Sequence, residues 1–167
     1  MPKDKLSIPT SEDAIAQARY RAKKIVNKQA LFSAGMTLVP VPGLDMAVDV
    51  TVMIKMIDSI NREFGLTPSQ IHQLRTRERL ATFEAINWLG AVLIGKVITS
   101  ELAIGVLKSL GVKVAGKQLA RWVPIVGQVS AATVGFAAMK YLGQQHIADC
   151  EVVAKRVSML LENHCES

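Results

Sequence analysis

The sequence predicts an all-α protein, a compact bundle of about five to six helices with an apolar central hairpin. Two observations predict it. Apolar residues recur at helical spacing along the chain, and Pro and Gly residues separate the resulting stretches. The interior is expected to be unusually apolar, because 50% of the residues are hydrophobic and only 20% are charged. A chain of 167 residues is about one domain long and can bury a core without metal or disulfide support.

The chain is expected to hold one folded domain between two short ends. We expect residues 1–10 to be a flexible N-terminal lead, residues 11–162 a single helical domain and residues 163–167 a C-terminal tail. The first helix should begin after Ser11, whose hydroxyl can cap it, because two carboxylates follow in the first turn. Its apolar residues keep helical spacing to about Thr37.

A turn and a second, apolar helix are predicted next. Pro40 and Pro42, followed by Gly43, break the first helix, because proline lacks a backbone donor and restricts the residue before it. The second helix should start near Leu44 and end at Gly65, which can adopt the left-handed conformation. Its first three turns are apolar on most sides, which predicts a buried helix.

The third helical stretch has the clearest boundary in the sequence. Thr67, Pro68 and Gln70 together form a predicted capping box with proline at the first helical position. The helix should pass through a charged stretch and bend or restart at residues 88–90, which gives a helical hairpin or two packed helices. Residues 111–121 are expected to be a polar joint.

The last helix is expected to open at Pro124 and reach Leu161. Residues 122–139 carry no charge and match the shortest bilayer span, but they are less apolar than a typical spanning helix. A buried helix in a soluble core and a membrane-inserted helix both stay open.

Two patterns in this region concern symmetry and packing. Residues 39–43 and 123–127 share the pattern V-P-x-x-G, and the prolines in second position are 84 residues apart. Either the chain consists of two related halves, or the two segments match by chance. Gly127, Ala131 and Gly135 form a ladder of small residues that lets another helix approach closely. The partner helix lies either in the same chain, where Ala91 and Gly95 offer a small face, or in a second copy.

Positive charge is concentrated near the N-terminus of this basic chain, whose net charge is +6. The first 30 residues hold seven basic and three acidic side chains. Such a helix attracts anionic lipid, acidic protein or nucleic acid, or is simply a solvated face. Nucleic acid ranks last, because aromatic interleaving and a helix-turn-helix signal are missing. The candidate membrane or partner contacts are Arg19, Arg21, Lys23, Lys24 and Lys28.

Asp45 and Asp49 are candidate buried acidic residues, one turn apart on an apolar helix. Asp45 lies in the first turn, where backbone donors can satisfy it. Asp49 lies one turn deeper and needs a partner, for which the candidates are Lys55, Lys96 and Arg121.

No catalytic chemistry is predicted. Residues 111–118 read G-x-x-x-x-G-K, but Gln118 replaces the hydroxyl residue that holds Mg²⁺, and no strand is predicted before the loop. The three histidines fall on different segments, and the two cysteines are too few for a disulfide framework. We expect no enzyme activity, no metal, no cofactor and no small-molecule substrate.

The chain resembles a bacterial family of small helical domains of unknown function over roughly residues 30–148. The residues that carry the resemblance are Pro40, Pro42 and Asp45, the helix end at Phe64-Gly65, and the late turn before the helix with Tyr141 and Gly143. Members are often attached to, or encoded beside, Era-like GTPases and are tied to membranes. The chain is also distantly similar to the helical domain of immunity-related GTPases, although no GTPase domain is expected within it.

These inferences predict a non-enzymatic, membrane-associated helical module that self-associates or works with a GTPase partner. The alternative is a soluble interaction module that docks a GTPase or another helical protein. The N-terminus lacks the apolar core of a secretory signal, so we expect the cytoplasmic face of the membrane or the cytoplasm.

Overall fold

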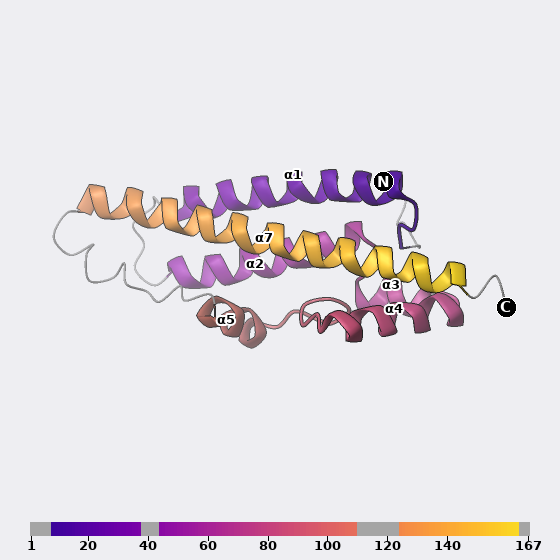
Figure 1. The fold of residues 1–167 in the computed structure, drawn as a ribbon. Helices are drawn as coiled ribbons and strands as arrows, with labels where there is room; N and C mark the ends of the chain where they lie inside the picture. The colour runs from indigo at the N-terminus through magenta and orange to yellow at the C-terminus, as the bar shows by residue number, and fades with distance from the viewer. Residues whose placement is uncertain (1–7, 38–43, 110–123, 164–167) are drawn as a thin grey trace.

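The computed structural model describes residues 8–37, 44–109 and 124–163, and every regular element in these ranges is helical (Figure 1). This confirms the predicted all-α bundle. The helices are α1 (Glu12–Thr37), α2 (Leu44–Glu63), α3 (Pro68–Gln73), α4 (Thr76–Leu89), α5 (Ser100–Ser109) and α7 (Pro124–Asn163).

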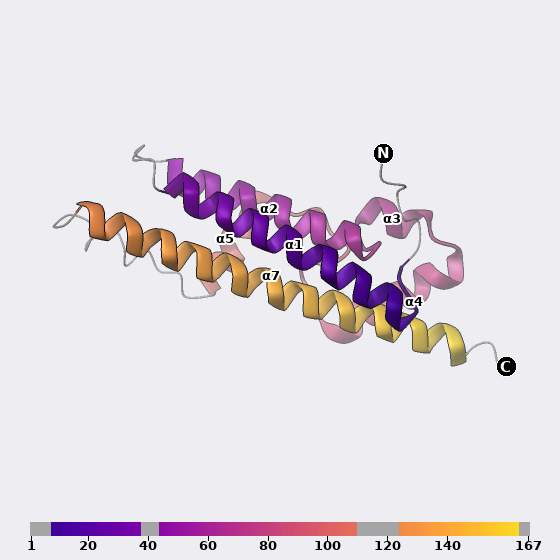
Figure 2. The same cartoon turned by 90° about the horizontal axis from the view of Figure 1, so that it is seen from above.

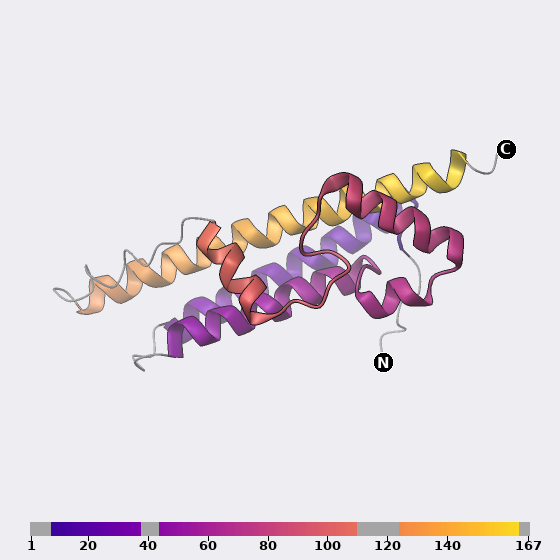
Figure 3. The ribbon, with the colours of Figure 1, turned by 90° about the horizontal axis from the view of Figure 1, so that it is seen from below.

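Three long helices form the frame of the bundle. α1 runs antiparallel to both α2 and α7, and it contacts both of them (Figures 1 and 2). α7 has 40 residues and extends about 60 Å at 1.5 Å per residue. Viewed from below, α4 and α5 lie on the near side of α7 and α2 (Figure 3), with contacts from α4 to α7 and from α5 to α2, while α3 follows the end of α2 and contacts α4. Within the described residues, none of the helices is long and apolar enough to cross a membrane.

α1 begins and ends where the sequence predicts. The Ser11 hydroxyl accepts a hydrogen bond from the Ala14 N–H at 3.2 Å, as a capping residue does. The buried face of α1 is made mostly of small residues at helical spacing, which lets α2 and α7 come close to its backbone. These buried residues are Ile15, Ala18, Ala22, Val26 and Ala30.

The closest approach of α7 to α1 is at Gly143. A Cβ atom added there would lie 2.6 and 2.8 Å from the two methyl carbons of Val26, and 3.2 Å from the Met56 sulfur on α2. Gly143 therefore sits where three helices meet, and a side chain larger than hydrogen has no room there. Gly143 lies eight residues after Gly135, and Met139 between them interrupts the four-residue spacing of the predicted small-residue ladder.

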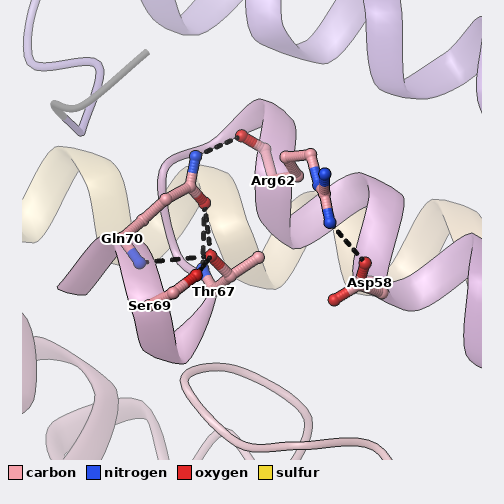
Figure 4. Close-up of polar contacts among 5 residues, drawn as sticks. All are labelled: Asp58, Arg62, Thr67, Ser69 and Gln70. Carbon is pink, nitrogen blue, oxygen red and sulfur yellow. Dashed lines mark hydrogen bonds and ion pairs between the residues drawn. The ribbon is translucent and has the colours of Figure 1, made fainter. Parts of the chain in front are cut away.

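The junction between α2 and α3 confirms the predicted capping box. Gly65 adopts φ +70°, and the Gln70 N–H donates to the Thr67 hydroxyl oxygen at 3.3 Å. The side-chain oxygen of Gln70 accepts a hydrogen bond from the Thr67 N–H at 3.2 Å, and the side-chain amide of Gln70 donates to the backbone carbonyl of Arg62 at 3.1 Å (Figure 4). These bonds fix the direction in which the chain leaves α2.

The predicted third helix is divided in two. α3 ends at Gln73 because Leu74 is extended, with ψ 152°, and only 7% of its surface is exposed. Burying Leu74 in the core turns the chain away from the helical path. α4 starts again at Thr76, where Glu78 accepts from the Arg75 N–H at 3.3 Å.

The segment after α4 also differs from the expected helix. α4 ends at Leu89, followed by Gly90 with φ +67°, within the predicted bend, but residues 91–99 are non-helical and α5 begins only at Ser100. Distant backbone and side-chain groups hold this segment. The Asn61 amide donates to the Leu93 carbonyl at 2.9 Å, and the Gly95 N–H donates to the Leu66 carbonyl at 3.2 Å. Gly95 therefore offers no helical face for the small-residue ladder.

Several predicted features lie outside the described residues. These are the turn at Pro40, Pro42 and Gly43, the joint at residues 111–121 and the loop at residues 111–118. Pro124 is the first residue of α7, as predicted. The two related halves stay a prediction, because residues 39–43, which would be compared with residues 123–127, lie outside the described residues.

Substituting Gly143 should destabilise the protein despite the higher helix propensity of alanine. We expect Gly143→Ala to lower the free energy of unfolding by about 1–3 kcal/mol, because Val26 and Met56 must move to make room. Gly35→Ala is the matched control, since Gly35 is also helical and nothing lies within 4 Å of its added Cβ; it should be neutral or stabilising by up to about 1 kcal/mol. Urea denaturation of both variants checks this, and equal effects would contradict the packing argument.

Removing the α3 cap should be measurable separately. Thr67→Ala is expected to lower the free energy of unfolding by about 1 kcal/mol, because the Gln70 N–H loses its acceptor. Thr67→Ser keeps the hydroxyl and should retain most of this stability. Thermal melts compare the two, and a serine variant as unstable as the alanine variant would show that the hydroxyl is not what stabilises the turn.

Candidate functional site: the outer face of the first helix

The five predicted basic contact residues all lie on α1, but they do not share one environment. Arg19 pairs with Glu151 of α7 at 3.4 Å, and Arg21 pairs with Glu63 of α2. These two arginines tie α1 to its two neighbouring long helices. Their charges are therefore partly neutralised by acidic residues of the neighbouring helices.

Lys24 and Lys28 instead lie on the solvent side of α1. The Lys24 ammonium lies 4.5 Å from the centre of the Tyr20 ring, a cation–π distance. Neither lysine forms an ion pair with any residue in the described ranges. Residues 20, 24, 28 and 31 follow each other at one helical turn, so they line one face of α1.

Large apolar side chains share this face with the lysines. The exposed fractions are 62% for Tyr20, 64% for Leu31 and 54% for Phe32. We call the group of Tyr20, Lys24, Lys28, Leu31 and Phe32 the outer face of α1. Its chemistry is a positive charge beside exposed aromatic and aliphatic groups. An open surface hollow lined in part by Asp13 and Gln17 borders it at Tyr20.

Lys23 lies on a different side of α1, toward α7. It is one turn after Arg19 and one turn before Asn27, whose side-chain oxygen accepts a hydrogen bond from Lys140 of α7 at 2.8 Å. Since Arg19 also bonds to α7, Lys23 sits along the seam between the two helices. It is exposed there.

The other predicted site residues are only partly described. Asp45 and Asp49 belong to α2, but their side chains lie outside the described set, as does Arg121, so their pairing stays a prediction. Two of the proposed partners, Lys55 and Lys96, are exposed. Gly127, Ala131 and Gly135 fall within α7, and their surroundings likewise lie outside the described set.

A buried polar cluster was missed by the sequence analysis. The His146 Nε2 atom lies 2.9 Å from the Asn61 side-chain oxygen, and the Cys150 sulfur lies 3.7 Å from the same oxygen. His146 and Cys150 are one helical turn apart on α7, a spacing that the sequence already displays. Because Asn61 also donates to the Leu93 carbonyl, the cluster joins α2, α7 and residues 91–99.

Both titratable members of this cluster are held in their neutral forms. Burial lowers the pKa of His146 from 6.5 to about 4. Burial, reinforced by the carboxylates of Asp149 and Glu151, raises the pKa of the Cys150 thiol well above its usual range. A neutral imidazole and a protonated, inaccessible thiol stabilise the fold and are poorly suited to nucleophilic chemistry. No group of three or more His, Cys, Asp or Glu side chains in the described ranges could hold a metal ion.

Comparison with models of known protein families gives a match. A family model described as "Domain of unknown function (DUF697)" covers residues 3–164. No curated protein and no solved structure matches the chain. The predicted resemblance to a family of domains of unknown function is confirmed by this match, which says nothing of GTPases.

The neutral His146 should make the protein less stable in acid. Its folded pKa lies below the unfolded value of 6.5, so the unfolded state binds the extra proton, and stability falls as the pH drops from about 6.5 to about 4. The expected loss is roughly 3 kcal/mol in the free energy of unfolding. Denaturant unfolding at a series of pH values measures it.

His146→Gln should flatten this part of the pH profile. His72→Gln is the matched control, because His72 is exposed on α3 and should leave the profile unchanged. If His146→Gln loses as much stability in acid as the unmodified chain, a different group accounts for the pH dependence.

Proposed function

The chain belongs to the DUF697 family of domains of unknown function, and we propose that it is a non-enzymatic helical module that binds membrane surfaces. The outer face of α1 is the observation that supports this most directly. We propose that this face binds the anionic headgroups of a bilayer from the cytoplasmic side.

The residue types on this face suit a lipid–water interface. The long, apolar stems of Lys24 and Lys28 can hold their ammonium groups at the level of the headgroups. Each lysine contributes about 1 kcal/mol of binding free energy near an anionic surface. Tyr20 has an apolar ring with a polar end, a combination enriched at such interfaces. Leu31 and Phe32, both more than half exposed, supply apolar surface for shallow insertion between headgroups.

The exposed apolar groups also argue against a purely solvated face. A helix side that only meets water is normally polar, and large apolar side chains there lose hydrophobic free energy of roughly 25 cal/mol per Å² left uncovered. Tyr20, Leu31 and Phe32 lie on one helix within residues 20–32, next to two lysines that have no ion pair in the described part of the chain. Contact with a surface that is both apolar and anionic would cover all five side chains.

A non-enzymatic role is supported by the location of the catalytic residue types. His146 and Cys150, together with Asn61, are buried in the core, and the imidazole and the thiol are neutral there. The surface hollow near Tyr20 is open to solvent, unlike the concave pockets that enclose small substrates.

Docking of a protein partner is the second candidate function. In this proposal the domain works with an Era-like GTPase or another helical protein, and any nucleotide chemistry belongs to that partner. An exposed row of residues on α7, described in the next section, favours it.

Vesicle co-sedimentation of the purified full chain tests the lipid contact. We expect binding to phosphatidylserine-containing vesicles and little binding to pure phosphatidylcholine. The double variant Lys24→Gln/Lys28→Gln should bind roughly tenfold or more weakly, since two headgroup contacts of about 1 kcal/mol are lost. Lys55→Gln/Lys96→Gln removes the same charge from exposed lysines elsewhere and should bind as the unmodified chain does.

A second pair of variants separates apolar from electrostatic contact. Leu31→Ser/Phe32→Ser should make the remaining binding fully salt-sensitive, because only charge attraction is left. If both double lysine variants lose the same amount of vesicle binding, the loss reflects the net charge of the chain and not the outer face of α1. No vesicle binding by the unmodified chain would overturn the proposal and leave the docking module.

A further inference from the structure

A second exposed face runs along α7. Six exposed residues follow each other at spacings of four, three, four, three and four, which is the spacing of the core positions of a coiled coil. They are Tyr141, Gln145, Ala148, Val152, Lys155 and Met159, which we call the α7 stripe.

The α7 stripe is on the opposite side of α7 from the bundle core. The buried side of the same helix includes Leu142, His146, Val153 and Val157. α7 lies along one edge of the bundle, with α1 next to it and α2 beyond (Figure 2). The exposed fractions of 54% for Tyr141 and 50% for Met159 show that no described part of the chain covers the two ends of the stripe.

The charges that border the stripe on its α1 side are mainly positive. Lys140 of α7 and Lys23 of α1 lie along the seam between the two helices, and Lys155 lies within the stripe. Glu151, the acidic residue on this border, is already paired with Arg19. Glu162, beyond Met159, is the exposed acidic exception.

We infer that the α7 stripe binds an acidic amphipathic helix of a partner protein. The apolar residues of that helix would pack on Tyr141, Ala148, Val152 and Met159 in coiled-coil fashion. Its flanking carboxylates would pair with Lys23, Lys140 and Lys155, because charges at flanking positions select the partner and its orientation. This inference rests on the second candidate function and gives the chemistry of the docking partner.

Self-pairing of the stripe is disfavoured by the same charges. In an antiparallel pair over the full length, the midpoint falls at residue 150, so Asp149 approaches its own copy, whereas the charge of Glu151 is already paired with Arg19. In a parallel pair, Lys155 meets Lys155 at a core position. Like charges at these positions oppose association. A helix that carries its carboxylates on the α1 side avoids both conflicts, because Asp149, two residues before Glu151, lies on the opposite border of the stripe.

The α7 stripe and the outer face of α1 share no residues. Lys24 and Lys28 face solvent on α1, whereas the stripe lies on α7 beyond the seam occupied by Lys23. Loss of lipid binding and loss of helix docking can therefore be measured on separate variants of the same chain.

Two designed peptides provide the probe. Both contain about three heptads with leucine at the core positions, and they differ only in carrying glutamate or lysine at the flanking positions. Fluorescence anisotropy of labelled peptide, titrated with the full chain, should show the glutamate peptide binding at least tenfold more tightly than the lysine peptide. Equal binding of the two, or no binding of either, would overturn the inference.

Variants of the stripe then locate the contact. Val152→Glu should weaken the glutamate peptide about tenfold or more, whereas Val97→Glu, at a valine that is 75% exposed outside the stripe, should not. Lys155→Glu should reverse the preference between the two peptides, which loss of folding cannot do. Unchanged peptide binding in both stripe variants would overturn the proposal. A concentration-dependent dimer that Val152→Glu abolishes would also overturn the proposal, since a second copy would then occupy the stripe. The same holds if the stripe variants lose vesicle binding alone, since lipid would then cover the stripe.

Discussion

The close contact between α1 and α7 at Gly143 is the constraint on which the rest of the bundle depends. Val26 and Met56 converge on a position without a side chain, so α7 lies against α1 and α2 at once. The small residues along the buried face of α1, Ala18, Ala22 and Ala30 among them, extend the same close packing along the helix. Once α7 is fixed in this groove, α4 packs on its remaining buried side, and none of the described helices covers its last face.

This arrangement also determines which charges are available at the surface. Arg19 and Arg21 emerge on the two flanks of α1, where acidic residues of α7 and α2 meet them. Lys24 and Lys28 emerge between those flanks, where no described helix covers them. The same helix therefore provides both ion pairs to its neighbouring helices and an outward basic face. Which role a basic residue has depends on the side of the helix from which it projects.

The sequence predicted those features of the fold that local interactions determine. The start of α1 at Ser11, the capping box at Thr67 and the opening of α7 at Pro124 depend on residues within one turn of each other. The break at Leu74 and the non-helical segment at residues 91–99 depend instead on burial and on partners far along the chain. Local helical periodicity continues through both regions and contains no sign of those contacts.

The candidate site was predictable to a similar extent. All five basic residues could be placed on the first helix, but their division into paired and unpaired groups required the positions of Glu63 and Glu151. The polar cluster at His146 required Asn61, which is 85 residues away. Spacing along one helix shows which side chains share a face; it does not show what that face meets.

The pairing of α1 with α7 has a consequence for synthesis of the chain. The buried face of α1 cannot be covered by α7 until more than a hundred further residues have left the ribosome, since Val26 packs against Gly143. Contacts of such long sequence separation form late and slow folding. The nascent α1 presents mostly alanine on this side, which exposes little apolar surface while it waits and gives chaperones and neighbouring nascent chains little to bind.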